Sequence, residues 1–155
     1  MDIVSRQKRK QMMSGIRGKN TRPEIGIRKG IHALGFRFRL HVKEIPGHPD
    51  IVLPKYKALI LVHGCFWHRH ACHLFKWPST RAEFWKKKIN GNVKNDEKIL
   101  AILKTSGWRC LIVWECALKG KTRLEKSELI KQIAEWILSE KKYQEIGGNR
   151  PRSRQ

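Results

Sequence analysis

The chain has 155 residues, of which 40% are hydrophobic, so its length and composition are those of one globular domain and exclude a disordered protein. It carries 34 lysine and arginine residues against 13 aspartate and glutamate residues, a formal net charge of +21. A positive excess this large indicates a polyanionic partner, most often nucleic acid. No apolar stretch approaches the roughly 18 residues of a membrane span, and no signal peptide opens the chain, so we expect a cytoplasmic protein.

A basic segment nearly free of acidic residues opens the chain. Residues 1–20 are expected to form a DNA-binding arm that orders on nucleic acid. A helix should follow, because Thr21 and Glu24 have the spacing of a capping box and Gly35 suits the end of a helix. Its apolar stripe would consist of Ile27, Ile31 and Leu34.

Alternating strand and helix patterns fill the rest of a folded domain over residues 21–140. Segments 36–42, 48–53 and 57–64 are rich in β-branched or aromatic residues and predict three strands. A second capping box, Thr80 to Glu83, should open a long helix that ends at Gly107. A further strand and a final amphipathic helix follow at 108–114 and at Leu129, Ile130, Ile133, Trp136 and Ile137. This order predicts an α/β fold in which helices pack on a mixed sheet, followed by a basic flexible tail over 141–155.

Histidine and cysteine are concentrated in residues 63–73, HGCFWHRHACH, where six of the eleven positions are one or the other. Thiolates and imidazoles at short spacing suit tetrahedral zinc. The residues that can wrap one ion from this loop are Cys65, His70 and Cys72. Cys116 supplies the fourth ligand if the strand before it neighbours the 57–64 strand, whereas Cys110 lies inside a strand and is expected to be a buried thiol. The alternative is a set of ordinary buried cysteines and surface histidines.

A second group of residues has the chemistry of a metal-dependent nuclease. Asp50 follows Pro49 at the start of a predicted strand and could hold Mg²⁺, although an isolated Pro-Asp pair is usually a plain turn. Free imidazole titrates near neutrality, so His63 and His68 are candidates for a general base or acid. Glu24 could orient water, but its spacing favours helix capping. The adjacent Phe66 and Trp67 are core residues or a wedge between base pairs, and spacing does not decide between these.

Four segments together resemble the very-short-patch repair (Vsr) DNA mismatch endonucleases: GHPDIV, VHGCFWHRHAC, TRAEFW and WECAL. The resemblance runs from about Met12 to Ile137. It implies a fold similar to that of type II restriction endonucleases. It also implies a strand-specific endonuclease that nicks double-stranded DNA on the 5′ side of the T in T:G mismatches. Such mismatches arise when 5-methylcytosine deaminates, and the nick initiates very short patch repair.

The resemblance implies a role for each candidate catalytic residue. Asp50 would bind Mg²⁺ together with the backbone of Val62, a position where a threonine can occur in the family. His68 would be the general base, His63 would lie against the scissile phosphate, and Glu24 would belong to the water network. The implied structural zinc ligands are Cys65, His70, Cys72 and Cys116.

The resemblance also implies DNA contacts. Met13 would enter the DNA opposite an aromatic wedge, and Lys88 and Asn92 would contact the mismatched pair. The wedge, entering from the major groove, would consist of Phe66, Trp67 and Trp85. We expect a bacterial, nucleoid-associated monomer with mismatch-repair proteins as possible partners.

Three other enzyme or binding classes compete with this interpretation. A His-Asn-His nuclease would need a late metal-binding histidine, but no histidine follows His73. A non-catalytic zinc DNA-binding module would leave Asp50, His63 and His68 without a role. A restriction-type endonuclease would cleave perfectly paired DNA. The six tryptophans and the dense central motifs also disfavour a ribosomal or histone-like packing protein.

Overall fold

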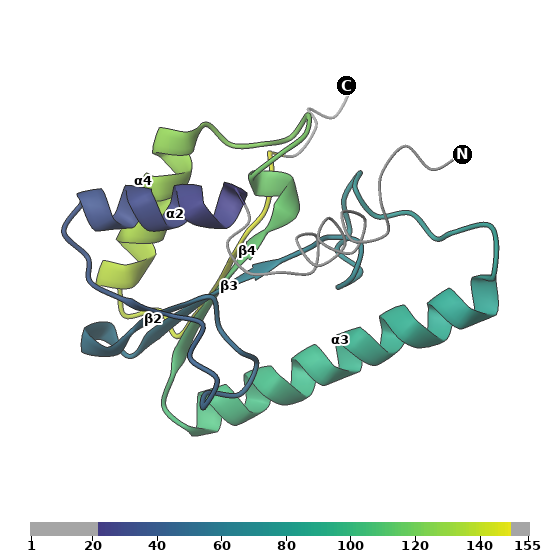
Figure 1. Cartoon of the computed structure of the whole chain (residues 1–155), viewed down its shortest axis with the longest axis horizontal. Coiled ribbons are helices and arrows are strands. Elements are labelled where there is room, and N and C mark those ends of the chain that lie inside the picture. The colour runs from purple at the N-terminus through teal and green to yellow at the C-terminus, as the bar shows by residue number, and fades with distance from the viewer. Residues whose placement is uncertain (1–21, 150–155) are drawn as a thin grey trace, which may run out of the picture.

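The computed structural model describes residues 22–149, which form a five-stranded mixed sheet with helices on both faces (Figure 1). The strands lie in chain order: β2 is antiparallel to β1 and to β3, and β3, β4 and β5 are mutually parallel. This arrangement confirms the predicted α/β class. The strand bounds are β1 (Arg39–Leu40), β2 (Ile51–Leu53), β3 (Ala58–His63), β4 (Arg109–Trp114) and β5 (Tyr143–Ile146).

Within residues 22–149, three helices cover the sheet, and two short 3₁₀ turns, Pro54–Tyr56 and Glu115–Ala117, follow β2 and β4. Helices α2 and α4 lie together on one face, and α3 lies on the other, where its first half extends beyond the sheet (Figure 1). Only Ile89 and Leu103 of α3 are buried, which is consistent with a helix that extends away from the core. The helix bounds are α2 (Arg22–Ala33), α3 (Ala82–Thr105) and α4 (Lys126–Leu138).

Strands β3 and β4 are apolar except for His63 at the end of β3 and Arg109 at the start of β4, because both faces of the sheet are covered. In β3, Ile60 packs in the core under α2 and α4, and its neighbour Leu59 packs in the core on the α3 side. In β4, Val113 and Ile112 alternate in the same way. These two central strands are the rigid support on which the candidate site is built.

Most predicted elements are confirmed, and their ends follow the expected chemistry. The five apolar positions predicted for the last helix are all buried in α4. Gly35 and Gly107 follow α2 and α3 with φ of 98° and 84°, a left-handed conformation that favours glycine. None of the described helices is long and apolar enough to cross a membrane.

Three details of the helix and strand predictions are wrong. Leu34 lies past the end of α2 and is 58% exposed, so it does not extend the buried stripe. Helix α3 begins at Ala82 after Arg81, with no side-chain cap, so Thr80 and Glu83 do not form a capping box. The strand expected over 36–42 is reduced to the two residues of β1, because the rest of the segment has no strand partner.

The sequence analysis did not predict β5, which lies in the segment assigned to a flexible tail. Its residues pair with β4, from Tyr143 opposite Cys110 to Ile146 opposite Val113. Only Ile146 of this strand is buried, so the short segment lacks the apolar alternation that identifies a strand. The basic arm with Met13, the capping residue Thr21 and residues 150–155 lie outside the described residues.

Candidate active site and metal cluster

Strand register brings the candidate residues to one edge of the sheet. Strands β3 and β4 are parallel, with His63 opposite Trp114, so Cys65 and Cys116 each follow the end of their strand by two residues. Strand β2 is antiparallel to β3, so Asp50, which precedes β2, lies beside the end of β3. Residues from three distant parts of the chain therefore meet at the carboxyl ends of the parallel strands.

The predicted zinc ligands form one compact cluster. Cys65, His70, Cys72 and Cys116 offer ligand atoms that all lie within 4.8 Å of one another. The Nδ1 atom of His70 is 3.5 Å from the Sγ atoms of both Cys65 and Cys116. Three thiols and one imidazole are a common ligand set of tetrahedral structural zinc. The geometry is therefore compatible with the predicted zinc site.

Backbone groups support the sulfur atoms of this cluster. The N–H of Cys116 donates to Cys65 Sγ at 3.3 Å, and the N–H of Gly148 donates to Cys116 Sγ at 3.2 Å. Burial raises the pKa of the Cys65 and Cys116 thiols, so a bound cation is needed to favour the thiolate form. Cys110 is outside the cluster and 4% exposed, and burial raises its pKa to about 11, which confirms it as a buried thiol.

A group of two carboxylates and an imidazole lies at the start of β2. Asp50 Oδ2 accepts a hydrogen bond of 2.7 Å from the N–H of Val62. Burial, together with a hydrogen bond to Glu24, raises the pKa of Asp50 to about 8. Glu24 is 4% exposed and also pairs with Arg28 at 2.7 Å. Glu24 is buried and Asp50 is half-buried, and two carboxyl groups in contact suit a shared proton or a bound cation, so this group fits a divalent cation.

His41 completes this group, and the sequence analysis did not single it out. Its Nε2 atom lies 3.5 Å from Glu24 Oε2, and Glu24, His41 and Asp50 offer ligand atoms within 4.8 Å of one another. The backbone N–H of His41 donates to the carbonyl oxygen of Asp50 at 3.3 Å. A histidine one residue past a short edge strand carries no pattern that would have marked it in the sequence.

The two histidines with proposed chemistry stack on each other. The rings of His63 and His68 have centroids 3.9 Å apart and planes 5° apart. Burial and the neighbouring charge of His68 lower the pKa of His63 to about 4, so this ring is neutral at neutral pH. The Nδ1 atom of His68 lies 2.6 Å from Oδ2 of Asp96, which fixes the orientation of the imidazole.

Asp96 is a site residue that sequence reasoning missed. It lies in α3, 28 residues from His68, among solvated lysines and asparagines. One signal was present: Ile89, Asn92, Asp96, Ile99 and Leu103 follow helical spacing, so Asp96 is an acid on the apolar stripe of the helix. An acidic residue in that position is costly unless it has a partner, and His68 is that partner.

Apart from Glu24, the catalytic candidates share one hollow of about 450 Å³. Asp50 and Val62 lie on its wall together with His63, His68 and Asp96. Trp114 separates this hollow from the metal cluster: its ring stacks on His70 at 4.1 Å and meets the edge of His63 at 5.4 Å. We call this set of residues the catalytic hollow.

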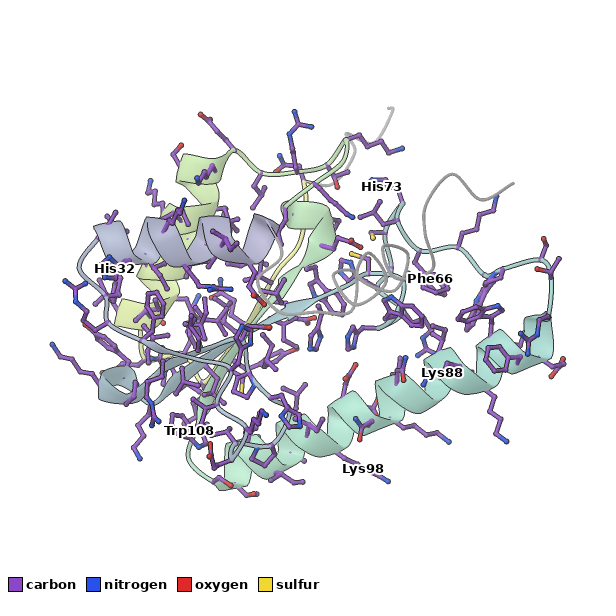
Figure 2. The ribbon with its side chains drawn as sticks, viewed as in Figure 1. His32, Phe66, His73, Lys88, Lys98 and Trp108 are labelled. Atoms are coloured by element: carbon purple, nitrogen blue, oxygen red, sulfur yellow. The ribbon has the colours of Figure 1, made fainter. Side chains whose placement is uncertain are left out.

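An aromatic cluster stands beside α3. Phe66 contacts Trp67 and Trp85 with ring centroids 5.3 Å and 5.5 Å apart, and Trp67 is 42% exposed. In Figure 2, Phe66 lies over the part of α3 that carries the exposed Lys88. Asn92 donates its side-chain amide to the carbonyl oxygen of Trp67 at 3.0 Å. None of the aromatic residues of this cluster belongs to the two buried cores in the described part of the chain.

Comparison with known proteins identifies the family. The model of the family described as DNA mismatch endonuclease Vsr matches residues 1–74. The DNA mismatch endonuclease Vsr of Escherichia coli is 41% identical over 90% of this chain and 89% of its own length. The chain belongs to the Vsr family of DNA mismatch endonucleases.

Two further relatives of this Vsr-family chain are named as nicking enzymes. The type II nicking enzyme V.XorIIP of Xanthomonas oryzae is 44% identical over 80% of this chain and 91% of its own length. The type II nicking enzyme V.NmeAIP of Neisseria meningitidis is 39% identical over 88% of this chain and 99% of its own length. The chain is therefore an endonuclease that acts on DNA and hydrolyses phosphodiester bonds.

Proposed function

We propose that this endonuclease nicks double-stranded DNA on the 5′ side of the T in a T:G mismatch formed by deamination of 5-methylcytosine, and so starts very short patch repair. One structural observation supports this activity in addition to the family membership. Asp50, which contacts the carboxyl group of Glu24, and a histidine–aspartate pair line one hollow, and partly exposed aromatic rings lie beside it. The first two features suit hydrolysis of a phosphodiester, and the third suits an opened base step.

We propose that Asp50 and the carbonyl oxygen of Val62 hold the catalytic Mg²⁺. The N–H of Val62 donates to Asp50, and in a strand the N–H and C=O of one residue point to the same side, so the carbonyl also faces Asp50. A backbone ligand explains why valine is acceptable at this position. Magnesium bound there would offset the negative charge that builds on the phosphate oxygens during the reaction.

His68 is proposed as the general base. Asp96 holds Nδ1, so Nδ1 carries the proton of the neutral ring and Nε2 is free to accept one. As the water oxygen bonds to phosphorus, its proton passes to Nε2, the bond from phosphorus to the 3′ oxygen breaks, and the leaving 3′ oxygen takes a proton from solvent water. The products are a 3′-hydroxyl and a 5′-phosphate. Asp96 acts through His68 and is therefore a positioning residue.

His63 and Glu24 have supporting roles in this proposal. His63 is neutral, since its pKa is lowered to about 4, and it can donate a hydrogen bond to the scissile phosphate without taking the proton that His68 removes. Glu24 contacts Asp50 and belongs to the water network of the hollow. The proposed Zn²⁺ at Cys65, His70, Cys72 and Cys116 is structural, because four protein ligands leave no open position for substrate.

The DNA is proposed to bind over α3 and the aromatic cluster. Phe66, Trp67 and Trp85 would form the wedge that opens the mismatched step, which is easier to open than a paired one. Lys88 and Asn92 would contact the mismatched pair. Met13 is proposed to enter from the opposite groove, although it lies outside the described residues. The net charge of +21 would attract the phosphates of a DNA duplex. The enzyme is proposed to act as a monomer.

The experiment that tests the proposal compares two duplexes that differ only in one base pair. The full-length, zinc-loaded protein is incubated with a T:G duplex and with the fully paired duplex, each strand labelled, with and without Mg²⁺. We expect a single nick 5′ of the mismatched T that requires Mg²⁺. Equal cutting of the paired duplex would instead favour a restriction-type endonuclease, and tight binding without cutting would favour a non-catalytic DNA-binding module.

A further inference from the structure

His41 occupies a backbone conformation that histidine rarely adopts. Its φ is 47°, in the left-handed region, immediately after the two residues of β1. Leu40 pairs with Ile51, so the next pair along the two strands is His41 and Asp50, whose side chains point to the same face of the sheet. The hydrogen bond from the N–H of His41 to the carbonyl oxygen of Asp50 holds this register. The local backbone therefore places an imidazole beside the carboxylate that is proposed to bind Mg²⁺.

The side chain of His41 is buried and one of its nitrogens lacks a hydrogen bond. Only 14% of the side chain is exposed, and Nε2 is inaccessible to solvent and makes no hydrogen bond. This atom faces Glu24 Oε2 at 3.5 Å, a distance beyond a good hydrogen bond but suited to two ligands of one ion. Buried polar atoms in folded proteins almost always have a partner, so an unpaired one needs an explanation.

We propose that His41 Nε2 is a nitrogen ligand of the divalent cation held by Asp50 and Glu24. This inference rests on the metal site of the proposed function at Asp50 and Val62, and it adds His41 and Glu24, which the proposed function placed in the water network, to the ligands of that ion. Two carboxylates and an imidazole meet within 4.8 Å, which is close enough for all three to reach one ion. The ion would lie between α2, which supplies Glu24, and the β1–β2 edge of the sheet.

A nitrogen ligand changes which cations this site prefers. Carboxylates and carbonyl oxygens suit Mg²⁺ and Mn²⁺ alike, whereas imidazole favours later first-row metals and is a poor ligand for Mg²⁺. The protein should therefore bind Mn²⁺ more tightly than Mg²⁺. Removing the imidazole should lower the affinity for Mn²⁺ by roughly tenfold or more and leave the affinity for Mg²⁺ nearly unchanged.

Pulsed electron paramagnetic resonance on the zinc-loaded, full-length protein tests the ligand directly, with Mn²⁺ as the probe. A directly bound imidazole gives a ¹⁴N coupling in the electron spin echo modulation. We expect this coupling in the unmodified protein, its loss in His41→Gln, and its retention in His32→Gln, which changes an exposed histidine of α2. A parallel Mn²⁺ titration should show weaker binding only in His41→Gln.

The outcomes separate this inference from the proposed function. If Mn²⁺ binding is unaffected by Asp50→Asn, the proposed metal site itself is wrong. If Asp50→Asn abolishes binding but the bound Mn²⁺ shows no ¹⁴N coupling, or a coupling that survives His41→Gln, only the role of His41 is overturned. If His41→Gln does not fold, the same ¹⁴N coupling is measured in a variant that carries His48→Gln, His63→Gln and His68→Gln. Persistence of the coupling in this variant supports His41 as the ligand. Loss of the coupling overturns the inference.

Discussion

The metal cluster and the catalytic hollow lie on opposite sides of Trp114, and their polar atoms are in very different states. In the metal cluster, backbone N–H groups of Cys116 and Gly148 donate to sulfur, and the four ligand atoms lie within 4.8 Å of one another. In the hollow, the pKa of Asp50 is raised to about 8, that of His63 is lowered to about 4, and His63 Nδ1 is buried without a hydrogen bond.

This difference teaches how a structural site can be told from a reactive one in a single fold. At a structural metal site, neighbouring backbone and side-chain groups of the protein make all the hydrogen bonds that the ligands need once the ion is bound. A reactive site keeps buried polar atoms without a hydrogen bond, such as Nδ1 of His63, because substrate and cation complete them. Variants on the metal-cluster side of Trp114 should therefore lose zinc and stability, whereas variants on the side of the hollow should lose nicking and keep the fold.

Cys116→Ser should have the largest effect, and on folding. Structural zinc contributes about 10–16 kcal/mol in zinc-finger peptides, so loss of one ligand should cost several kcal/mol of folding free energy. We expect loss of bound zinc and unfolding well below the melting temperature of the parent protein, measured by zinc content and circular dichroism. The matched control is Cys110→Ser, a buried thiol of β4 outside the cluster, which should keep its zinc. Stoichiometric zinc in folded Cys116→Ser would remove Cys116 from the ligand set.

Asp50→Asn should abolish nicking and leave zinc content and folding intact. The amide preserves shape but removes the charge proposed to hold Mg²⁺, and several kcal/mol of transition-state stabilisation correspond to about 10³-fold or more in rate. DNA binding should survive, since a carboxylate near phosphate is repulsive until a cation neutralises it. Single-turnover nicking, zinc analysis and a binding assay measure the three properties. Loss of zinc in this variant would mean that the two sites are not independent.

Asp96→Asn should slow nicking by about 10² while mismatch affinity stays within about twofold, in line with the usual contribution of general acid–base catalysis. The amide no longer favours the tautomer in which Nε2 of His68 accepts a proton. A positioning role also predicts a changed pH profile of the single-turnover rate, which a purely structural role would not produce. An unchanged profile with a normal rate would show that the 2.6 Å contact to His68 is dispensable.

Phe66→Ala combined with Trp67→Ala should weaken binding to a T:G duplex by about 10- to 100-fold relative to the paired duplex. Stacking of a base on an aromatic ring is worth about 1–3 kcal/mol. Tyr143→Ala is the matched control, because Tyr143 is 47% exposed on β5 and has no place in the proposed wedge. If the double variant is folded and discriminates between the two duplexes as well as the parent, the aromatic cluster has a packing role only.

The smallest effect concerns pH and stability without Mg²⁺. The pKa of Asp50 is about 8 in the folded protein and 3.8 when unperturbed, so the folded state keeps a proton that the unfolded state loses. Stability from this group is present at low pH and is lost as pH rises from about 4 to about 8. Relative to Asp50→Asn, the parent should lose at least about 1 kcal/mol of unfolding free energy over this range. A difference that does not change with pH would contradict the shared proton, and added Mg²⁺ should abolish the loss.

Much of this protein follows from local sequence patterns. The four proposed zinc ligands were recognised because cysteine and histidine cluster in one short loop and Cys116 follows a recognisable strand. Asp50 and His63 lie at the start and at the end of strong strand signals, and His68 follows in the next loop, so the sequence predicts that the three lie near one another. The helix ends near Gly35 and Gly107 also follow from local sequence, because glycine adopts the left-handed conformation after a helix more easily than other residues.

Only the tertiary structure decided the partners of these residues. Asp96 reaches His68 from a helix 28 residues away, and His41 reaches Glu24 through the register of a two-residue strand. Strand β5 was invisible in the sequence because its stability comes from pairing with β4 and from the hydrogen bond of 2.8 Å between Glu145 and Trp114. The physical reason is common to all three: sequence patterns report the local backbone and burial preference of a segment, whereas a hydrogen bond or ligand contact depends on which distant segments the fold brings together.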